Sequence, residues 1–112
     1  MNYINTKVII IGAGPAGIAC TNQLKRYNID SIIIEKEQIG GLVKNANLIE
    51  NYPGFPKGIS GKKFVQLLKQ QVKINDLNLF CEKVVTINQN NNLFSIETDK
   101  NSYQSEYVVI AS

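Results

Sequence analysis

Three glycines at the junction between two regular elements constrain this chain more than any other feature of its sequence. Within VIIIGAGPAGIACTNQLKRY, Gly12, Gly14 and Gly17 follow the spacing G-x-G-x-x-G. An apolar run typical of a buried parallel strand (residues 7–11) precedes them, and a helical pattern (residues 15–27) follows. In such a unit the first glycine makes a tight turn, the second admits a pyrophosphate and the third lets helix and strand pack closely. We therefore predict an α/β, Rossmann-like fold whose first turn binds a dinucleotide.

The residues around the glycines favour the same ligand. The N-terminus of the helix that begins at Pro15 offers N–H groups and the positive end of the helix dipole to phosphates. Proline is tolerated at this position, because an N–H group there would have no hydrogen-bond partner within the helix. Glu35 ends the next apolar run, about 20 residues further on, where a carboxylate is expected to hold ribose hydroxyls. A carboxylate there repels a 2′-phosphate, which favours NAD or FAD over NADP. The alternative is a glycine-rich turn that serves packing alone.

Beyond this unit, the sequence predicts a parallel sheet with a small β-meander. Residues 36–60 form a long irregular stretch that is too apolar for disorder, so we expect a functional loop packed against the core. Ser60 is a suitable cap for a helix over residues 61–74. Strands are expected at residues 77–81, 83–88, 93–98, 102–104 and 107–111. The last of these reads as a buried strand, which we expect to lie beside residues 7–11.

Composition narrows the possible chemistry. A chain of 112 residues predicts a single domain over residues 1–112. A net charge of +3, spread along the chain, argues against a nucleic-acid partner. We expect no membrane partner and a cytoplasmic location, since the sequence shows no spanning run and no secretory signal. The chain has no histidine, and Cys20 and Cys81 lie far apart in the sequence, so we expect no metal site and no catalytic residue. We expect both cysteines to be small residues of the core. Any chemistry must then come from a cofactor.

A second motif connects the chain to a known family. Gly40 and Gly41 follow the acidic residue, and the stretch ENYPGFP occupies residues 50–56. Together with the glycine triplet and the closing VVIA, these features resemble the low-molecular-weight thioredoxin reductases and related pyridine-nucleotide flavoprotein oxidoreductases over nearly the whole chain. The resemblance implies a FAD cofactor and, if a further domain is supplied, NAD(P)H as co-substrate. It also implies hydride transfer from the nicotinamide through FAD to a disulfide or another acceptor.

Carried over residue by residue, the resemblance implies one FAD site. Glu35 and Lys36 would face the adenosine ribose, and main-chain groups around Val84 would lie at the edge of the adenine. Gly41 and Leu42 would run beside the ribityl chain and the ring. The residues that would approach the pyrophosphate are Gly12, Gly14, Pro15, Ala16 and Gly17 from the first turn, with Ala111 and Ser112 from the closing strand.

The loop residues have simpler alternatives. Asn51 is implied to make a polar contact near the flavin, but an asparagine there could equally cap a turn. Tyr52, Phe55 and Pro56 could pin the loop to the core. Leu42 replaces the glutamine that often follows the glycine pair in the reductases, which weakens assignment to thioredoxin reductase itself.

The resemblance also implies parts that the chain does not contain, namely a second, NADPH-binding domain and a return segment that completes the FAD fold. We therefore expect a truncated product or one half of a split flavoprotein, with a complementing polypeptide or a second copy as partner. Without that partner, residues 107–111 would leave a bare apolar strand edge. The alternatives are a non-catalytic NAD- or FAD-binding module and an inactive remnant.

Overall fold

The order of elements follows the sequence pattern closely. The computed structural model describes residues 2–111, so the predicted site residue Ser112 lies outside the described residues. The elements are β1 (Ile4–Ile11), α1 (Pro15–Arg26), β2 (Ser31–Glu35), the short 3₁₀ helix η1 (Gly41–Asn45), α2 (Gly61–Ile74), β3 (Leu79–Cys81), β4 (Val84–Asn90), β5 (Leu93–Thr98) and β6 (Ser102–Ile110).

One mixed sheet organises the molecule. Its strand order is β3-β2-β1-β6-β5-β4. β1 runs parallel to both β2 and β6, and β2 runs parallel to β3. β4, β5 and the first part of β6 form an antiparallel meander. The predicted α/β fold, a Rossmann-like parallel sheet with a small meander, is therefore confirmed.

β6 differs from its prediction in two ways. The expected strands at residues 102–104 and 107–111 are one continuous strand, which pairs with β1 from Ile4↔Tyr103 to Ile11↔Ile110. Its first part also pairs with β5, and this pairing ends at Phe94↔Ser105. Beyond that point no further strand among residues 2–111 lies beside β6. This agrees with the bare apolar edge expected for residues 107–111, and Tyr107 and Ile110 are 58% and 63% exposed, so this part of β6 is not buried as its apolar sequence predicted.

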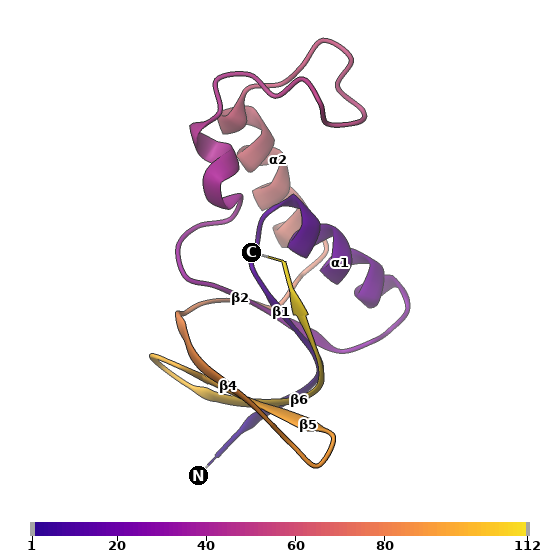
Figure 1. Ribbon diagram of the computed structural model, residues 1–112. Helices are drawn as coiled ribbons and strands as arrows, with labels where there is room; N and C mark the ends of the chain where they lie inside the picture. Colours follow the sequence, from indigo (N-terminus) through magenta and orange to yellow (C-terminus); the bar gives the residue numbers. More distant parts are fainter. Residues whose placement is uncertain (1, 112) are drawn as a thin grey trace.

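The sheet has a core on each face. Ile10 and Ile33 face the helices and pack with Phe64 and Leu68 of α2. Figure 1 shows both helices on this side, while the meander curls around the other end of the sheet. On the second face, the core is formed by Ile9, Ile32, Ile34, Ile96 and Tyr103. β2 and the second half of β1 are therefore buried on both faces, which explains their continuous apolar runs.

Several local signals in the sequence are confirmed. The Ser60 hydroxyl accepts a hydrogen bond from the Lys63 N–H (3.2 Å), as an N-cap does. Asn28 follows α1 with φ 58°, and Asn91 and Asn92 take up positive φ in the β4–β5 turn. None of the helices among residues 2–111 is both long and apolar enough to cross a bilayer.

The long loop is only partly packed. The Tyr52 and Phe55 rings lie 4.8 Å and 5.8 Å, centre to centre, from the Phe64 ring of α2. In contrast, Leu42 is 85% exposed and Leu48 is 55% exposed. Cys20 is half-buried and packs against the core on the helix side, whereas Cys81 is exposed at the edge strand β3, so the core position predicted for Cys81 was wrong.

Candidate nucleotide site

The three glycines have three different geometries. Gly12 has φ 111°, a conformation that side chains disfavour, and it turns the chain out of β1. A Cβ on Gly17 would lie 1.9 Å from the Gly12 carbonyl oxygen, so the close packing predicted for Gly17 is confirmed. A Cβ on Gly14 would meet no atom of residues 2–111 within 4 Å. Internal packing therefore does not require a glycine at position 14, and the space beside its main chain is open to a ligand.

The start of α1 adds an electrostatic feature to this space. Gly14 is the N-cap residue, no described side chain caps the helix, and Pro15 occupies the first turn. The first helical hydrogen bond runs from the Ile18 N–H to the Gly14 carbonyl (3.1 Å). The N–H groups of the preceding turn have no partner within the helix and point out along its axis. Such a terminus favours phosphate oxygens.

Glu35 lies directly beside the glycine turn. It is buried at the end of β2, where its Oε1 accepts the Ala13 N–H (2.8 Å) and its Oε2 accepts the Glu37 N–H (3.0 Å). These two bonds, which sequence reasoning missed, fix the carboxylate against the turn. An ionised carboxylate offers about four acceptor positions. Two therefore remain for the ribose hydroxyls that the sequence predicts as its partners.

A cavity at the ends of the parallel strands joins these features. This strand-end cavity has a volume of about 260 Å³, and its lining residues are Ile11, Gly12, Ile34, Glu35, Lys36, Glu82, Lys83 and Val84. Four predicted site residues thus come together from three separate segments of the chain. Pockets that enclose a complete ligand of drug size span roughly 300–1,000 Å³. The strand-end cavity is smaller than this range, so it has room for only part of a dinucleotide-sized ligand.

Glu82 is a site residue that sequence reasoning did not identify. It is 5% exposed, and its carboxylate accepts hydrogen bonds from Thr98 Oγ1 (2.6 Å), Asn101 Nδ2 (2.7 Å) and Tyr103 Oη (2.7 Å). Burial acts to raise the pKa of this carboxyl, but the three donors and the nearby Lys100 together leave the pKa below its ordinary value. The pKa of Tyr103 is raised by burial and by its bond to Glu82. Because its partners lie 16 to 21 positions away, no local sequence pattern indicates this cluster.

The predicted contacts from the closing strand and the glycine pair lie beside the turn. The Ala111 N–H donates to the Ile11 carbonyl (2.8 Å), which places Ala111 at the end of β1. The Gly40 N–H donates to the Ala13 carbonyl (2.7 Å), so Gly41 begins η1 directly beyond this anchor. Leu42 follows with a side chain directed to solvent.

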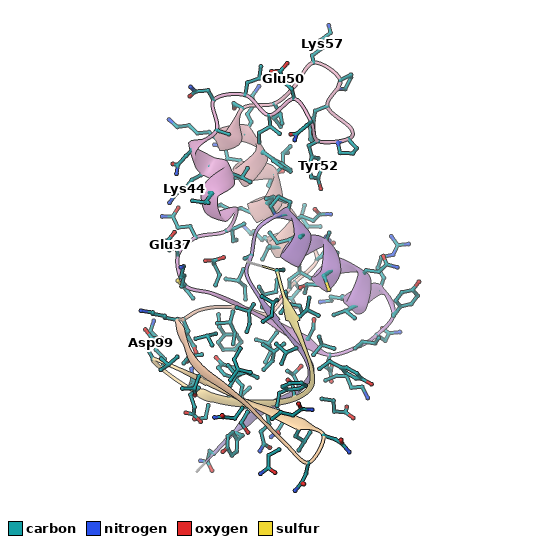
Figure 2. The ribbon with its side chains drawn as sticks, viewed as in Figure 1. Glu37, Lys44, Glu50, Tyr52, Lys57 and Asp99 are labelled. Carbon is teal, nitrogen blue, oxygen red and sulfur yellow. The ribbon has the colours of Figure 1, made fainter. Side chains whose placement is uncertain are left out.

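Asn51 is placed apart from the strand-end cavity. It is exposed in the loop and lines a separate shallow hollow formed by residues 50–56. In Figure 2, Glu50 and Lys57 project outward from this loop, whereas Tyr52 is directed toward α1. The structure thus brings together the residues predicted for the adenosine and pyrophosphate but not the one predicted for a polar flavin contact.

A larger cavity lies elsewhere, between α1 and α2. It measures about 650 Å³, and Pro15 is the single predicted site residue that lines it. Its walls carry amides, and the Asn75 Nδ2 donates to the Asn22 Oδ1 (2.8 Å) between the two helices. Neither the glycine triplet nor Glu35 lines this space, whereas Gly12 and Glu35 both line the smaller strand-end cavity.

Comparisons with known proteins show which proteins the chain resembles. The profile of the family described as pyridine nucleotide-disulphide oxidoreductase matches residues 6–112. Thioredoxin reductase from Borreliella burgdorferi is 35% identical over 104 residues, which cover 93% of this chain and 32% of that protein. The crystal structure of thioredoxin reductase from Streptococcus pyogenes superposes with a TM-score of 0.89 at 29% identity, over 99% of this chain and 36% of that one. Bacillithiol disulfide reductase from Staphylococcus aureus superposes with a TM-score of 0.86 at 26% identity, over 96% of this chain and 38% of that one. The chain spans about a third of the length of the curated relatives it matches.

Proposed function

Because this chain belongs to the pyridine nucleotide-disulphide oxidoreductase family, we propose that it binds FAD at the glycine turn and the strand-end cavity. It would serve as the flavin-binding part of an NAD(P)H-dependent oxidoreductase that resembles thioredoxin reductase. The acceptor class we propose is a disulfide, which is supported by the name of the family and by the likeness to a bacillithiol disulfide reductase.

One observation carries the proposal: the open main chain at Gly14 lies between a helix N-terminus and the cavity that holds the Glu35 carboxylate. The twin phosphates would approach Gly14 closely, where a side chain would obstruct them. The nucleoside would occupy the cavity, with its ribose at Glu35 and its adenine beside the main chain of Val84. These residues fit the adenosine and pyrophosphate that FAD contains.

The residues of this chain contribute binding and orientation. When FAD is bound, its isoalloxazine ring supplies the hydride chemistry, and the protein supplies position and electrostatics. Glu35 and the amides of the glycine turn would fix one end of the molecule, so the direction in which the ring projects would be set by the first turn of α1. Among the residues we assign to the site, no side chain acts as a nucleophile.

The test is FAD binding by the purified chain and two variants. We expect the wild type to take up FAD, to quench its fluorescence and to release free FAD on heating. Gly14→Val should abolish uptake, because its methyl groups would occupy the space of the pyrophosphate. Ala19→Val is the matched control, since Ala19 is an exposed residue of the same helix outside the strand-end cavity. Undiminished FAD affinity in Gly14→Val would refute the proposed site.

A second candidate is a non-catalytic module that holds NAD, which shares the adenosine and pyrophosphate of FAD. The small volume of the strand-end cavity supports this candidate too, because the cavity would hold the nucleoside that NAD and FAD share and does not enclose a flavin. Thermal unfolding distinguishes the two. A ligand at 100 times its Kd stabilises the folded state by about 2.7 kcal/mol. Stabilisation by FAD supports the flavoprotein, whereas stabilisation by NAD but not by FAD supports the module.

A further inference from the structure

Glu82 occupies an unusual position for a buried carboxylate. It lines the strand-end cavity together with Glu35, yet its side chain is directed into the meander, where it accepts hydrogen bonds from three donors. Two of these donors, Thr98 and Asn101, flank the β5–β6 turn, and the third, Tyr103, lies in β6 with 0% exposure. A buried carboxylate loses hydration, and an apolar side chain could join two elements without that cost. Its presence here therefore calls for a role that apolar packing does not serve.

The main chain around Glu82 connects the two halves of the cavity. Its N–H donates to the Glu35 carbonyl (3.0 Å), which ties it to the end of β2. The next residue, Lys83, exchanges two hydrogen bonds with Asp99: its N–H donates to Asp99 Oδ1 (2.9 Å), and its carbonyl accepts the Asp99 N–H (3.0 Å). β4 begins immediately afterwards at Val84. Glu82 is therefore the joint at which the meander is attached to the strand that carries Glu35.

We propose that Glu82 is a positioning residue for the adenosine part of the nucleotide: it holds the main chain of Val84 at the distance from Glu35 that admits the base. This inference rests on the proposed function. The hydrogen bonds fix direction as well as distance, because both carboxylate oxygens are engaged and the donors come from both sides of one turn. Apolar packing would leave the meander free to slide by fractions of an ångström.

The choice of a carboxylate follows from the number of donors. An ionised carboxylate accepts all three bonds without contributing a proton of its own. Glutamine has nearly the same shape, but its NH₂ group would face a donor at one of the three positions. Glu82→Gln therefore disturbs the three hydrogen bonds to this side chain with little change in its volume. Glu97→Gln is the matched control, because Glu97 also lies in the meander, accepts a hydrogen bond from Ser102 Oγ (2.7 Å) and does not line the strand-end cavity.

The experiment is an NMR titration of the ¹⁵N-labelled chain with two probes, ADP and inorganic pyrophosphate. Both probes reach the amides of residues 12–17, but only ADP places an adenosine in the strand-end cavity. We expect Glu82→Gln to weaken ADP binding about tenfold, which corresponds to about 1.4 kcal/mol. Pyrophosphate binding should change less than twofold in the same variant. Glu97→Gln should bind both probes as the wild type does. A merely structural role of Glu82 would weaken both probes together.

The outcomes separate this inference from the proposed function. If the wild type binds neither ADP nor FAD, the proposed function fails and this inference fails with it. If the wild type binds ADP and Glu82→Gln binds it equally well, or loses both probes to the same extent, the inference alone is overturned. Should Glu82→Gln fail to give a dispersed spectrum, Tyr103→Phe replaces it, because that variant removes one donor and keeps the carboxylate. The same selective loss of ADP is expected there, and equal affinity would overturn the inference.

Discussion

Replacing Gly17 by alanine tests how tightly the first helix is held against its strand. The new Cβ would lie 1.9 Å from the Gly12 carbonyl oxygen, whereas ordinary contact begins near 3.4 Å. The obstructing atom belongs to the main chain, so no side chain can rotate away, and α1 itself must move. Overpacking of this kind costs about 3 kcal/mol at the upper end of its usual range. Alanine in a helix recovers up to about 1 kcal/mol relative to glycine.

The net expectation for Gly17→Ala is a loss of about 2 kcal/mol, a substantial part of the 5–15 kcal/mol that usually stabilises a domain. For a chain of this size the midpoint of thermal unfolding should fall by roughly 10 °C. Circular dichroism at increasing temperature measures this directly. The matched variant is Gly14→Ala, whose Cβ meets no atom of residues 2–111 within 4 Å, so its cost should stay below about 1 kcal/mol, mostly from a poorer N-cap. Equal midpoints for the two variants would refute the packing argument.

Three further predictions concern stability. Ser60→Ala removes the cap of α2 and should cost about 1 kcal/mol in urea unfolding; an unchanged midpoint would mean that the hydroxyl bond to the Lys63 N–H is dispensable. Asn92→Ala places a methyl-bearing residue at φ 67° and should cost about 1 kcal/mol, whereas Asn92→Gly should not, by the same assay. Because the pKa of Glu82 is lowered on folding, its contribution to stability is present above its ordinary value near 4.5 and is lost as pH falls through the lowered pKa. The ionisable groups around it are Glu35, Lys36, Lys83, Lys100 and Tyr103. Glu82→Gln should therefore be less stable than the wild type at pH 7, and the difference should shrink as the pH falls through the lowered pKa of Glu82; a constant difference would contradict this assignment.

The sequence predicts the parts of this fold that depend on neighbouring residues. The strand that ends at Glu35 and the helix over residues 61–74 have the predicted bounds, because their apolar periods and the cap at Ser60 are local signals. The roles of Gly12 in the turn and Gly17 in packing could also be predicted, since the spacing itself requires a strand, a turn and a helix in close contact.

The remainder depends on residues that are distant in the chain. The polar stretch at residues 105–106 indicates a break, yet β6 continues through it because β1 supplies a hydrogen-bonding partner along its whole length. The Glu35 side chain binds the Ala13 amide 22 positions away, and the Glu82 cluster joins residue 82 to residues 98–103. The sequence also could not predict which side chains of the long loop are exposed. Leu42 and Leu48 are as apolar as the aromatic residues of the loop, but the aromatic residues pack against α2, whereas the two leucines are exposed.

The position of β6 in the sheet has a consequence for how the chain comes together during synthesis. β6, the last of the six described strands in chain order, lies between β1, the first, and β5. Until β6 inserts, the N-terminal strands and the β4–β5 hairpin share no strand ladder, and they are linked through the Glu82 N–H bond to the Glu35 carbonyl. Contacts between the two ends of a chain form slowly, because the loop between them must close first. The contacts between β1 and β6 therefore form late, and the meander joins the N-terminal strands in one sheet only after β6 has been made.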